Sequence, residues 1–158
     1  MSDFEQKKLD EREATMVAIV GTSYNMTENE ERDVRQTIAF ILKDYNPNET
    51  TIISGGAKGV DTLAKQIAES QGFNVKTIPP KGEGWEFNRA RNIEIANQCD
   101  ELFCISIPYY KNTDRIRCYH HTPHGDHQKT AGCFTMNKAL EQKKLCKLIV
   151  TQQRYADC

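Results

Sequence analysis

The chain has 158 residues, of which 21 are basic and 22 are acidic, so its formal net charge is −1 at pH 7. This length suits a single domain that can bury a core without disulfides or metals. The balanced charge argues against the broad basic surface with which proteins bind duplex DNA. No apolar run approaches the length needed to cross a bilayer, so we expect no membrane partner.

Residues 1–14 are predicted to form a polar arm, and residues 15–158 a single domain. The arm lacks the apolar segment of a secretory signal, so we expect a cytoplasmic protein. The six cysteines are then expected to stay reduced. Three of them, Cys99, Cys104 and Cys146, fall in or beside predicted elements and are expected to act as small apolar side chains.

Short apolar runs alternate with amphipathic segments along the chain. The apolar runs predict five strands, at residues 16–20, 51–53, 73–78, 102–107 and 145–150. The amphipathic segments predict four helices: one from a capping box of Thr27 and Glu30 to residue 45, one from residue 60 to a stop at Gly72, and two at 86–98 and 135–144. This alternation predicts an α/β fold, a single Rossmann-like domain with a doubly wound, mainly parallel sheet of about five strands. Residues 108–131 break the alternation as an irregular, His- and Cys-rich insertion before the last helix.

Two glycine-rich turns follow the first two predicted strands. They are Gly21-Thr22-Ser23 and Ser54-Gly55-Gly56-Ala57, the second leading to Asp61 in the next helix. Ligands of open α/β sheets bind outside the carboxyl ends of the strands, where glycine lets an anion approach the backbone and the following helix offers free N–H groups. The spacing is neither that of a Walker A loop nor that of GxGxxG, so tight turns that only pack helix on strand are the alternative. Asp61 is either a ligand contact or a helix cap.

The run ISGGAKGVDTLA at 53–64 resembles the SLOG superfamily of Rossmann-like proteins, which includes DNA-processing proteins of the DprA/Smf type and the LOG nucleotide phosphoribohydrolases. Three further segments support the resemblance. Residues 20–23 resemble the glycine turn after the first strand, 85–100 resemble the RN-containing helix of the YspA-like branch, and 130–135 resemble the late glycine-Thr turn.

The resemblance implies a nucleotide or nucleotide-derived ligand held by a sensor or carrier module, possible pairing as a homodimer, and site residues at matching positions. The expected ligand-binding residues are Gly21, Thr22, Ser23, Ser54, Gly55, Gly56, Ala57, Asp61, Arg89, Arg91, Asn92, Gly132 and Thr135. Arg89 either contacts phosphate or lies on a solvated helix face, and Trp85 either stacks on a base or is a buried capping aromatic.

Two other activities stay open on the same residues. LOG enzymes carry a catalytic glutamate where this chain has Lys138 and Ala139, so a hydrolase of the N-glycosidic or phosphate bond would need Asp61, Glu83 or Glu86 in its place. DprA-like proteins are similar in fold and bind single-stranded DNA through basic surface, so a single-stranded nucleic-acid binder is the other alternative.

All four histidines fall between Cys118 and His127, and Cys133 follows closely. Cys118 and His121 have the spacing of a zinc ligand pair, and His127 and Cys133 would complete a structural Cys2His2 site, with His120 and His124 as substitutes. Alternatively, the histidines are exposed or contact the ligand. Asp126 could serve a catalytic zinc, and Cys133 with His127 could form a catalytic pair.

Overall fold

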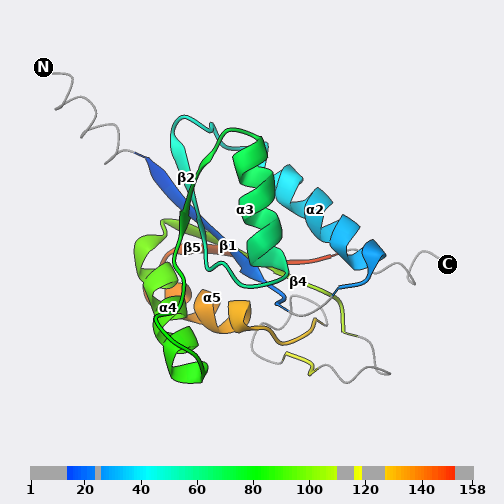
Figure 1. Ribbon diagram of the computed structural model, residues 1–158, viewed down its shortest axis with the longest axis vertical. Helices are drawn as coiled ribbons and strands as arrows, with labels where there is room; N and C mark the ends of the chain where they lie inside the picture. The colour runs from blue at the N-terminus through cyan, green and yellow to red at the C-terminus, as the bar shows by residue number, and fades with distance from the viewer. Residues whose placement is uncertain (1–13, 24–25, 110–115, 119–126, 152–158) are drawn as a thin grey trace, which may run out of the picture.

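The structure is a computed structural model and describes residues 14–23, 26–109, 116–118 and 127–151. Its elements are β1 (Thr15–Gly21), α2 (Glu28–Leu42), β2 (Thr50–Ser54), α3 (Val60–Ser70), β3 (Asn74–Thr77), α4 (Trp85–Gln98), β4 (Glu101–Ser106), α5 (Ala131–Glu141) and β5 (Leu145–Val150). The five strands form one sheet in the order β3-β2-β1-β4-β5, and every pair is parallel. The predicted Rossmann-like α/β fold is confirmed (Figure 1).

The central strand β1 is covered on both of its faces. Val17 and Ile19 pack with α2 and α3 in one core cluster, whereas Ala18 and Val20 pack with α4 and α5 in the other. Figure 1 shows the two helix pairs on opposite sides of the sheet. This double burial explains why the sequence of β1 is a continuous apolar run rather than an alternating one.

The strand order reverses at β1. The chain first builds outward through β2 and β3, then crosses back through α4 and places β4 and β5 on the other side of β1. Ligands of such sheets bind outside the carboxyl ends of the strands next to this reversal. The end of β1, at Gly21, is therefore the expected place for a site.

The first helix begins where the sequence predicts. Thr27 Oγ1 accepts a hydrogen bond of 3.2 Å from the Glu30 amide, and Glu30 Oε1 accepts one of 2.9 Å from the Thr27 amide. This reciprocal pair is the predicted capping box. Two amide donors at the start of α2 are thereby satisfied.

The last helix begins one turn earlier than predicted. The expected range of 135–144 is wrong at both ends, because α5 spans Ala131–Glu141. Thr130 is the reason: its Oγ1 accepts a hydrogen bond of 3.3 Å from the Cys133 amide and caps the helix there. The late glycine turn is thus the first turn of α5 rather than a loop.

The described ends of the insertion pair with each other. Antiparallel bridges join Pro108 to His127 and Arg117 to Gln128, although the sequence showed no strand pattern in this region. The predicted metal ligand His121, its substitutes His120 and His124, and Asp126 lie outside the described residues. None of the helices in the described ranges is both long and apolar enough to cross a membrane.

Candidate functional site

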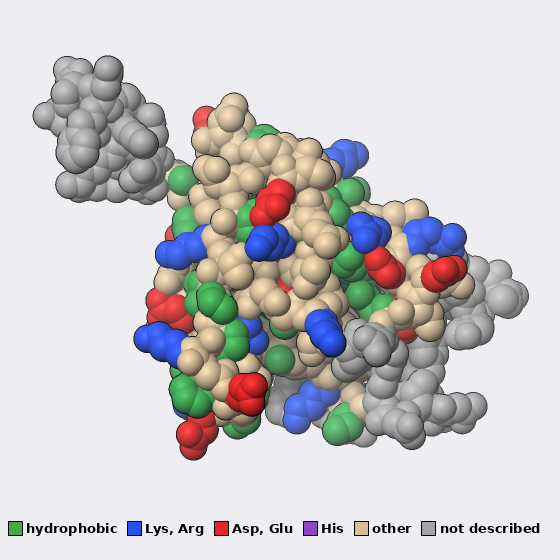
Figure 2. All heavy atoms as spheres, viewed as in Figure 1, with side chains coloured by type: hydrophobic (Ala, Val, Ile, Leu, Met, Phe, Trp, Pro, Cys, Tyr) green, Lys and Arg blue, Asp and Glu red, His purple; other side chains and the backbone are tan. Residues whose placement is uncertain are grey.

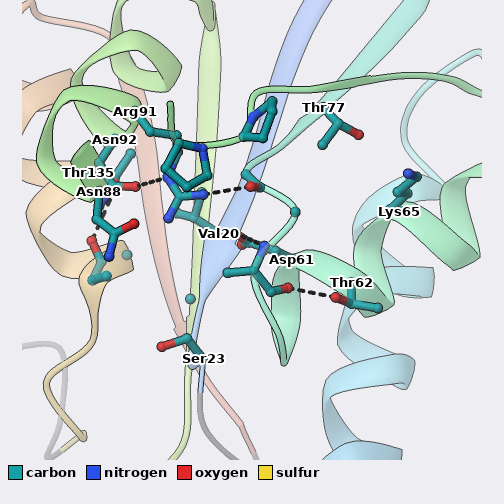
Figure 3. Close-up of a pocket in the computed structure, with 18 of the residues that line it drawn as sticks. Val20, Ser23, Asp61, Thr62, Lys65, Thr77, Asn88, Arg91, Asn92 and Thr135 are labelled. Carbon is teal, nitrogen blue, oxygen red and sulfur yellow. Dashed lines mark hydrogen bonds between the residues drawn. The ribbon is translucent and has the colours of Figure 1, made fainter. Parts of the chain in front are cut away.

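A cavity of about 750 Å³ opens at the carboxyl ends of β1, β2 and β3. Its walls come from α3, α4 and the first turn of α5 (Figure 3). This volume is typical of small-molecule and cofactor sites. Of the residues predicted to bind a ligand, those that line the cavity are Gly21, Ser23, Gly55, Gly56, Ala57, Asp61, Arg91, Asn92, Gly132 and Thr135.

Three predicted site residues do not line this cavity. Thr22 is fully buried, and its carbonyl accepts a hydrogen bond of 2.9 Å from the Val60 amide at the start of α3. The Ser54 hydroxyl donates to the Asp61 carbonyl at 2.9 Å and accepts from the Gly56 amide at 3.2 Å. The Thr22 backbone and the Ser54 side chain therefore support the turns. The third, Arg89, is exposed on α4.

The turn after β2 requires glycine at position 55. A Cβ atom at Gly55 would lie 2.8 Å from Arg91 Nη1 and 2.8 Å from Asp61 Oδ2, closer than real Cβ atoms approach their neighbours. Gly56 follows with φ at +75°, a backbone conformation that glycine adopts without steric cost. The small residues of this turn therefore let the side chains from α3 and α4 close in on the backbone.

Arg91 connects α4 to this turn. Its Nη1 donates a hydrogen bond of 2.6 Å to the Gly55 carbonyl, and its Nε donates one of 2.7 Å to Asn92 Oδ1 (Figure 3). The Arg91 side chain is largely buried, so its positive charge is held in the cavity wall rather than in solvent. A ligand anion would meet a guanidinium that is already oriented.

Asn92 supplies a donor that the protein does not use. Its Oδ1 accepts from Arg91, but Asn92 Nδ2 is buried and has no hydrogen-bond partner among the described residues. Asn92 is only 4% exposed and lines the cavity. A buried N–H group without a partner is costly, so this atom is poised for an acceptor on a ligand or an ordered water.

Asp61 places a carboxyl group on the opposite wall, in the first turn of α3 (Figure 3). Its Oδ2 accepts a hydrogen bond of 3.4 Å from the Ala57 amide. Burial raises the pKa of Asp61 from 3.8 to about 7, although Arg91 and the amides of Ala57 and Gly55 act in the opposite direction. Near neutral pH the group therefore exists in both protonation states and can donate or accept a hydrogen bond.

Two helix N-termini converge at the cavity. Gly132 in the first turn of α5 packs directly on Gly21 at the end of β1, since a Cβ at Gly132 would lie 2.8 Å from Gly21 Cα. α3 starts after Gly59 and has no side-chain cap. The positive dipole ends of α3 and α5 favour an anion between them.

Several cavity residues escaped the sequence reasoning. On α3, Lys65 and Glu69 follow Asp61 at spacings of four residues, so one polar face of the helix lines the cavity. This spacing could have identified both residues from the sequence. At the end of β3, Thr77 could have been found from the rule that ligands meet strand ends. The other lining residues that the sequence analysis did not single out are Val20, Thr62, Gln66, Pro79, Pro80, Asn88 and Ala131.

An aromatic pair stands at the rim of the cavity. Trp85 lines the cavity, is 54% exposed, and meets the Phe134 ring edge-on at a centroid distance of 5.3 Å. Two cations approach the same Phe134 ring, with Arg89 Cζ at 5.9 Å and Lys138 Nζ at 5.5 Å from its centroid. Trp85 is therefore not the buried capping aromatic that was one of the two alternatives.

The charged side chains of the described surface are mixed. In Figure 2, basic and acidic groups are interspersed on the visible face, and hydrophobic side chains gather over α4. Of the three carboxylates considered as substitutes for the LOG glutamate, Asp61 lines the cavity, whereas Glu83 and Glu86 do not. A hydrolytic role would thus fall to Asp61.

Three of the four predicted metal ligands lie among the described residues. Cys118, His127 and Cys133 come together as buried residues, outside the cavity lining. Cys99 and Cys104 are buried in the core cluster beside α4 and α5, as expected of small apolar side chains. Hydrogen bonds with Cys104 and His127 lower the pKa of the Cys133 thiol, and the bond to Cys133 together with burial raises the pKa of Cys104.

Comparison with known proteins finds a matching family model and similar solved structures. The family model described as DNA recombination-mediator protein A matches residues 4–115. The structure of DNA processing protein A (DprA) from Streptococcus pneumoniae is similar with a TM-score of 0.59 and 20% identity, covering 89% of this chain and 52% of that chain. The structure of a protein designated TM1055 is similar with a TM-score of 0.57 and 16% identity, covering 84% and 72%. No curated protein matches the chain significantly.

The matches cover only parts of the proteins compared. The chain spans about half the length of the DprA structure. The family match includes both glycine turns and α4, but it ends before Cys118, His127 and Cys133. The three soft donors are therefore a feature outside the matched region.

Proposed function

This chain belongs to the DNA recombination-mediator protein A family, within the SLOG superfamily, and from that premise we propose that it binds a nucleotide unit in the cavity at the strand ends. The observation that carries the proposal is the unused donor Asn92 Nδ2, which is buried in the cavity wall. The protein acts as a binding module, either a sensor or a carrier. Its ligand is a nucleotide or nucleotide derivative.

The phosphate of such a ligand fits the floor of the cavity. The first turns of α3 and α5 contribute to its lining, and so do Gly55 and Gly132, which add no side chain of their own. The Asn92 amide adds a donor beside the oriented guanidinium of Arg91. Backbone amides, a helix dipole and a positive side chain are the common elements of phosphate sites.

The base fits the rim. Trp85 exposes about half of its surface at the cavity mouth, and an exposed indole provides a stacking face for a purine or pyrimidine. Phe134 holds the indole edge-on from α5. A nucleotide bound in this way extends from the floor of the cavity, where its phosphate lies, to the mouth, where its base lies.

Single-stranded DNA is the second candidate, and the rim favours it. Arg89 and Lys138 lie beyond Trp85 around the Phe134 ring, so a strand that leaves the cavity would meet two cations and an aromatic pair. Aromatic faces next to basic side chains are typical of single-strand binding surfaces. The family description, which names DNA recombination, points to the same partner.

Calorimetric titration with adenosine monophosphate and with oligothymidylates of increasing length tests both candidates. Asn92→Asp keeps the oxygen that accepts from Arg91 and replaces the free donor by a second oxygen. It should weaken mononucleotide binding by about 10-fold to 100-fold, the effect of losing a hydrogen bond to a charged group. Asn97→Asp makes the same chemical change on an exposed part of α4, outside the cavity, and should bind like the wild type.

The outcomes separate the candidates. Binding of the mononucleotide that does not increase with oligonucleotide length supports the small-ligand module. Affinity that rises with length and falls steeply with salt supports single-stranded DNA, because each bound phosphate releases counterions. Conversion of the nucleotide to product would show hydrolysis. No binding of either probe to the wild-type chain contradicts the proposal.

A further inference from the structure

Two cysteine thiols and one imidazole come together at the first turn of α5, outside the lining of the proposed nucleotide site. The Cys118 and Cys133 sulfurs and a His127 ring nitrogen all lie within 4.8 Å of one another, and all three residues are buried. The distance from His127 Nε2 to Cys133 Sγ is 3.9 Å. We propose that these residues bind a zinc ion that fastens the ends of the 108–131 insertion to α5.

The donor set selects the metal class. Thiolate sulfur and imidazole nitrogen are donors that zinc takes, whereas Mg²⁺ and Ca²⁺ require oxygen donors. These three protein ligands leave the fourth position of a tetrahedral zinc to a water molecule or a further ligand. With Zn–S and Zn–N bonds of roughly 2.0–2.3 Å, tetrahedral ligand atoms lie about 3.3–3.8 Å apart. The observed group is within about 1 Å of that arrangement, so rotation of side chains alone could close the site.

The backbone already holds each donor in place. The Cys118 amide donates a hydrogen bond of 2.9 Å to the His127 carbonyl, which fixes the two insertion strands against each other. The Ser106 hydroxyl donates to the Gln128 carbonyl at 2.8 Å and anchors this pair to β4. Cys133 is fixed independently in the first turn of α5 by the Thr130 cap. Donors from three separate segments thus converge before any metal binds.

Two other interpretations account for less of this arrangement. Cys118 and Cys133 belong to the core cluster under α5, but packing alone does not explain a buried imidazole beside both sulfurs. A catalytic Cys133–His127 pair would need access to a substrate, and neither residue lines the cavity. Metal binding accounts for the proximity of all three side chains and for their burial.

Zinc analysis of the reduced wild-type protein, together with cobalt substitution, tests the proposal. Protein purified from zinc-supplemented medium should contain about one zinc per chain, as measured by inductively coupled plasma mass spectrometry. Replacing zinc by Co²⁺ should produce the thiolate charge-transfer band and the visible bands of tetrahedral cobalt. These two measurements use the wild-type chain, so they do not depend on how well any variant folds.

Matched variants identify the ligands. Cys118→Ser, His127→Gln and Cys133→Ser should each lower zinc content severalfold and weaken the cobalt bands. Cys146→Ser, on β5 and outside the group, should keep both signals at the wild-type level. Two results would overturn the proposal: reduced wild-type protein that takes up neither zinc nor cobalt, or zinc content that is unchanged in all three ligand variants.

Discussion

Arg91 donates a hydrogen bond of 2.6 Å to the Gly55 carbonyl across 36 residues of sequence. This bond joins α4, on one face of the sheet, to the turn that leads into α3, on the other face. The same guanidinium donates to Asn92 Oδ1. Arg91 therefore holds the two walls of the cavity in register, in addition to placing positive charge in it.

Replacing Arg91 should lower the stability of the fold. Arg91→Ala leaves the Gly55 carbonyl and Asn92 Oδ1 without their donor in a buried place, which should lower the free energy of unfolding by about 1–3 kcal/mol. Urea denaturation measures this loss. Arg89→Ala removes an exposed arginine from the same helix and should change stability by less than about 0.5 kcal/mol. Equal stability of the two variants would show that the Arg91 bonds contribute nothing.

Asp61 should make stability depend on pH. Its pKa is about 7 in the folded protein and 3.8 as the ordinary value, so between these values the folded state keeps a proton that the unfolded state has released. The contribution is therefore fully present below about pH 4 and is lost as pH rises through about 7. At roughly 1.4 kcal/mol per pKa unit, the loss amounts to at most about 4 kcal/mol.

Asp61→Asn isolates this effect, because the amide is uncharged at every pH and keeps an oxygen that can accept from the Ala57 amide. Urea unfolding of both proteins at several values between pH 4 and pH 8 gives the comparison. The wild type should lose stability relative to the variant as pH rises. A constant difference across this range would mean that Asp61 titrates near its ordinary value.

The contact between Gly132 and Gly21 should tolerate no added methyl group. In Gly132→Ala the new Cβ would lie 2.8 Å from the Gly21 backbone, so α5 must move away from β1 at a cost of about 1–3 kcal/mol. Gly82→Ala is the control, because the atoms nearest to its Cβ would belong to the exposed, movable ring of Phe87 rather than to backbone. Thermal melting should separate the two variants by several degrees. Identical melting temperatures would contradict the close packing.

Trp85 should matter for the base and little for the fold. Trp85→Ala removes an exposed ring from the cavity mouth, so it should leave stability nearly unchanged and weaken binding of a nucleotide by about 1–3 kcal/mol. Binding of inorganic phosphate should stay the same. Phe87→Ala removes another exposed aromatic of α4 that does not line the cavity, and nucleotide binding should not change. Isothermal titration calorimetry, which needs no tryptophan signal, measures nucleotide affinity for the wild type and the two variants.

Much of the fold could be predicted because its signals are local. Each apolar run of a strand spans only a few residues, and so does the capping box of Thr27 and Glu30. The structure confirms both signals. The start of α5 was missed because Gly132 and Cys133 are poor helix formers, and the cap at Thr130 decided the boundary instead. The strand order could not be predicted, because it depends on contacts between residues that are distant in sequence, and the periodicity of apolar residues gives no information about such contacts.

The candidate site was predictable in its location more than in its chemistry. The strand-end rule and the glycine turns placed the cavity, and most of the predicted residues line it. The bond from Arg91 to Gly55, the unused amide of Asn92 and the raised pKa of Asp61 depend on burial created by the whole fold. Local sequence carries no measure of that burial. Thr22 and Ser54 have the residue types of a site but serve as supports for the turns.

The order in which the cavity walls occur along the chain has a consequence for biosynthesis. The turns after β1 and β2 emerge first from a ribosome, α4 follows, and the first turn of α5 emerges last. The nascent chain thus can pack α2 and α3 on the first three strands while the cavity still lacks two of its walls. A ligand of this cavity cannot assist that early half, and its stabilising effect begins only when nearly the entire domain has been translated.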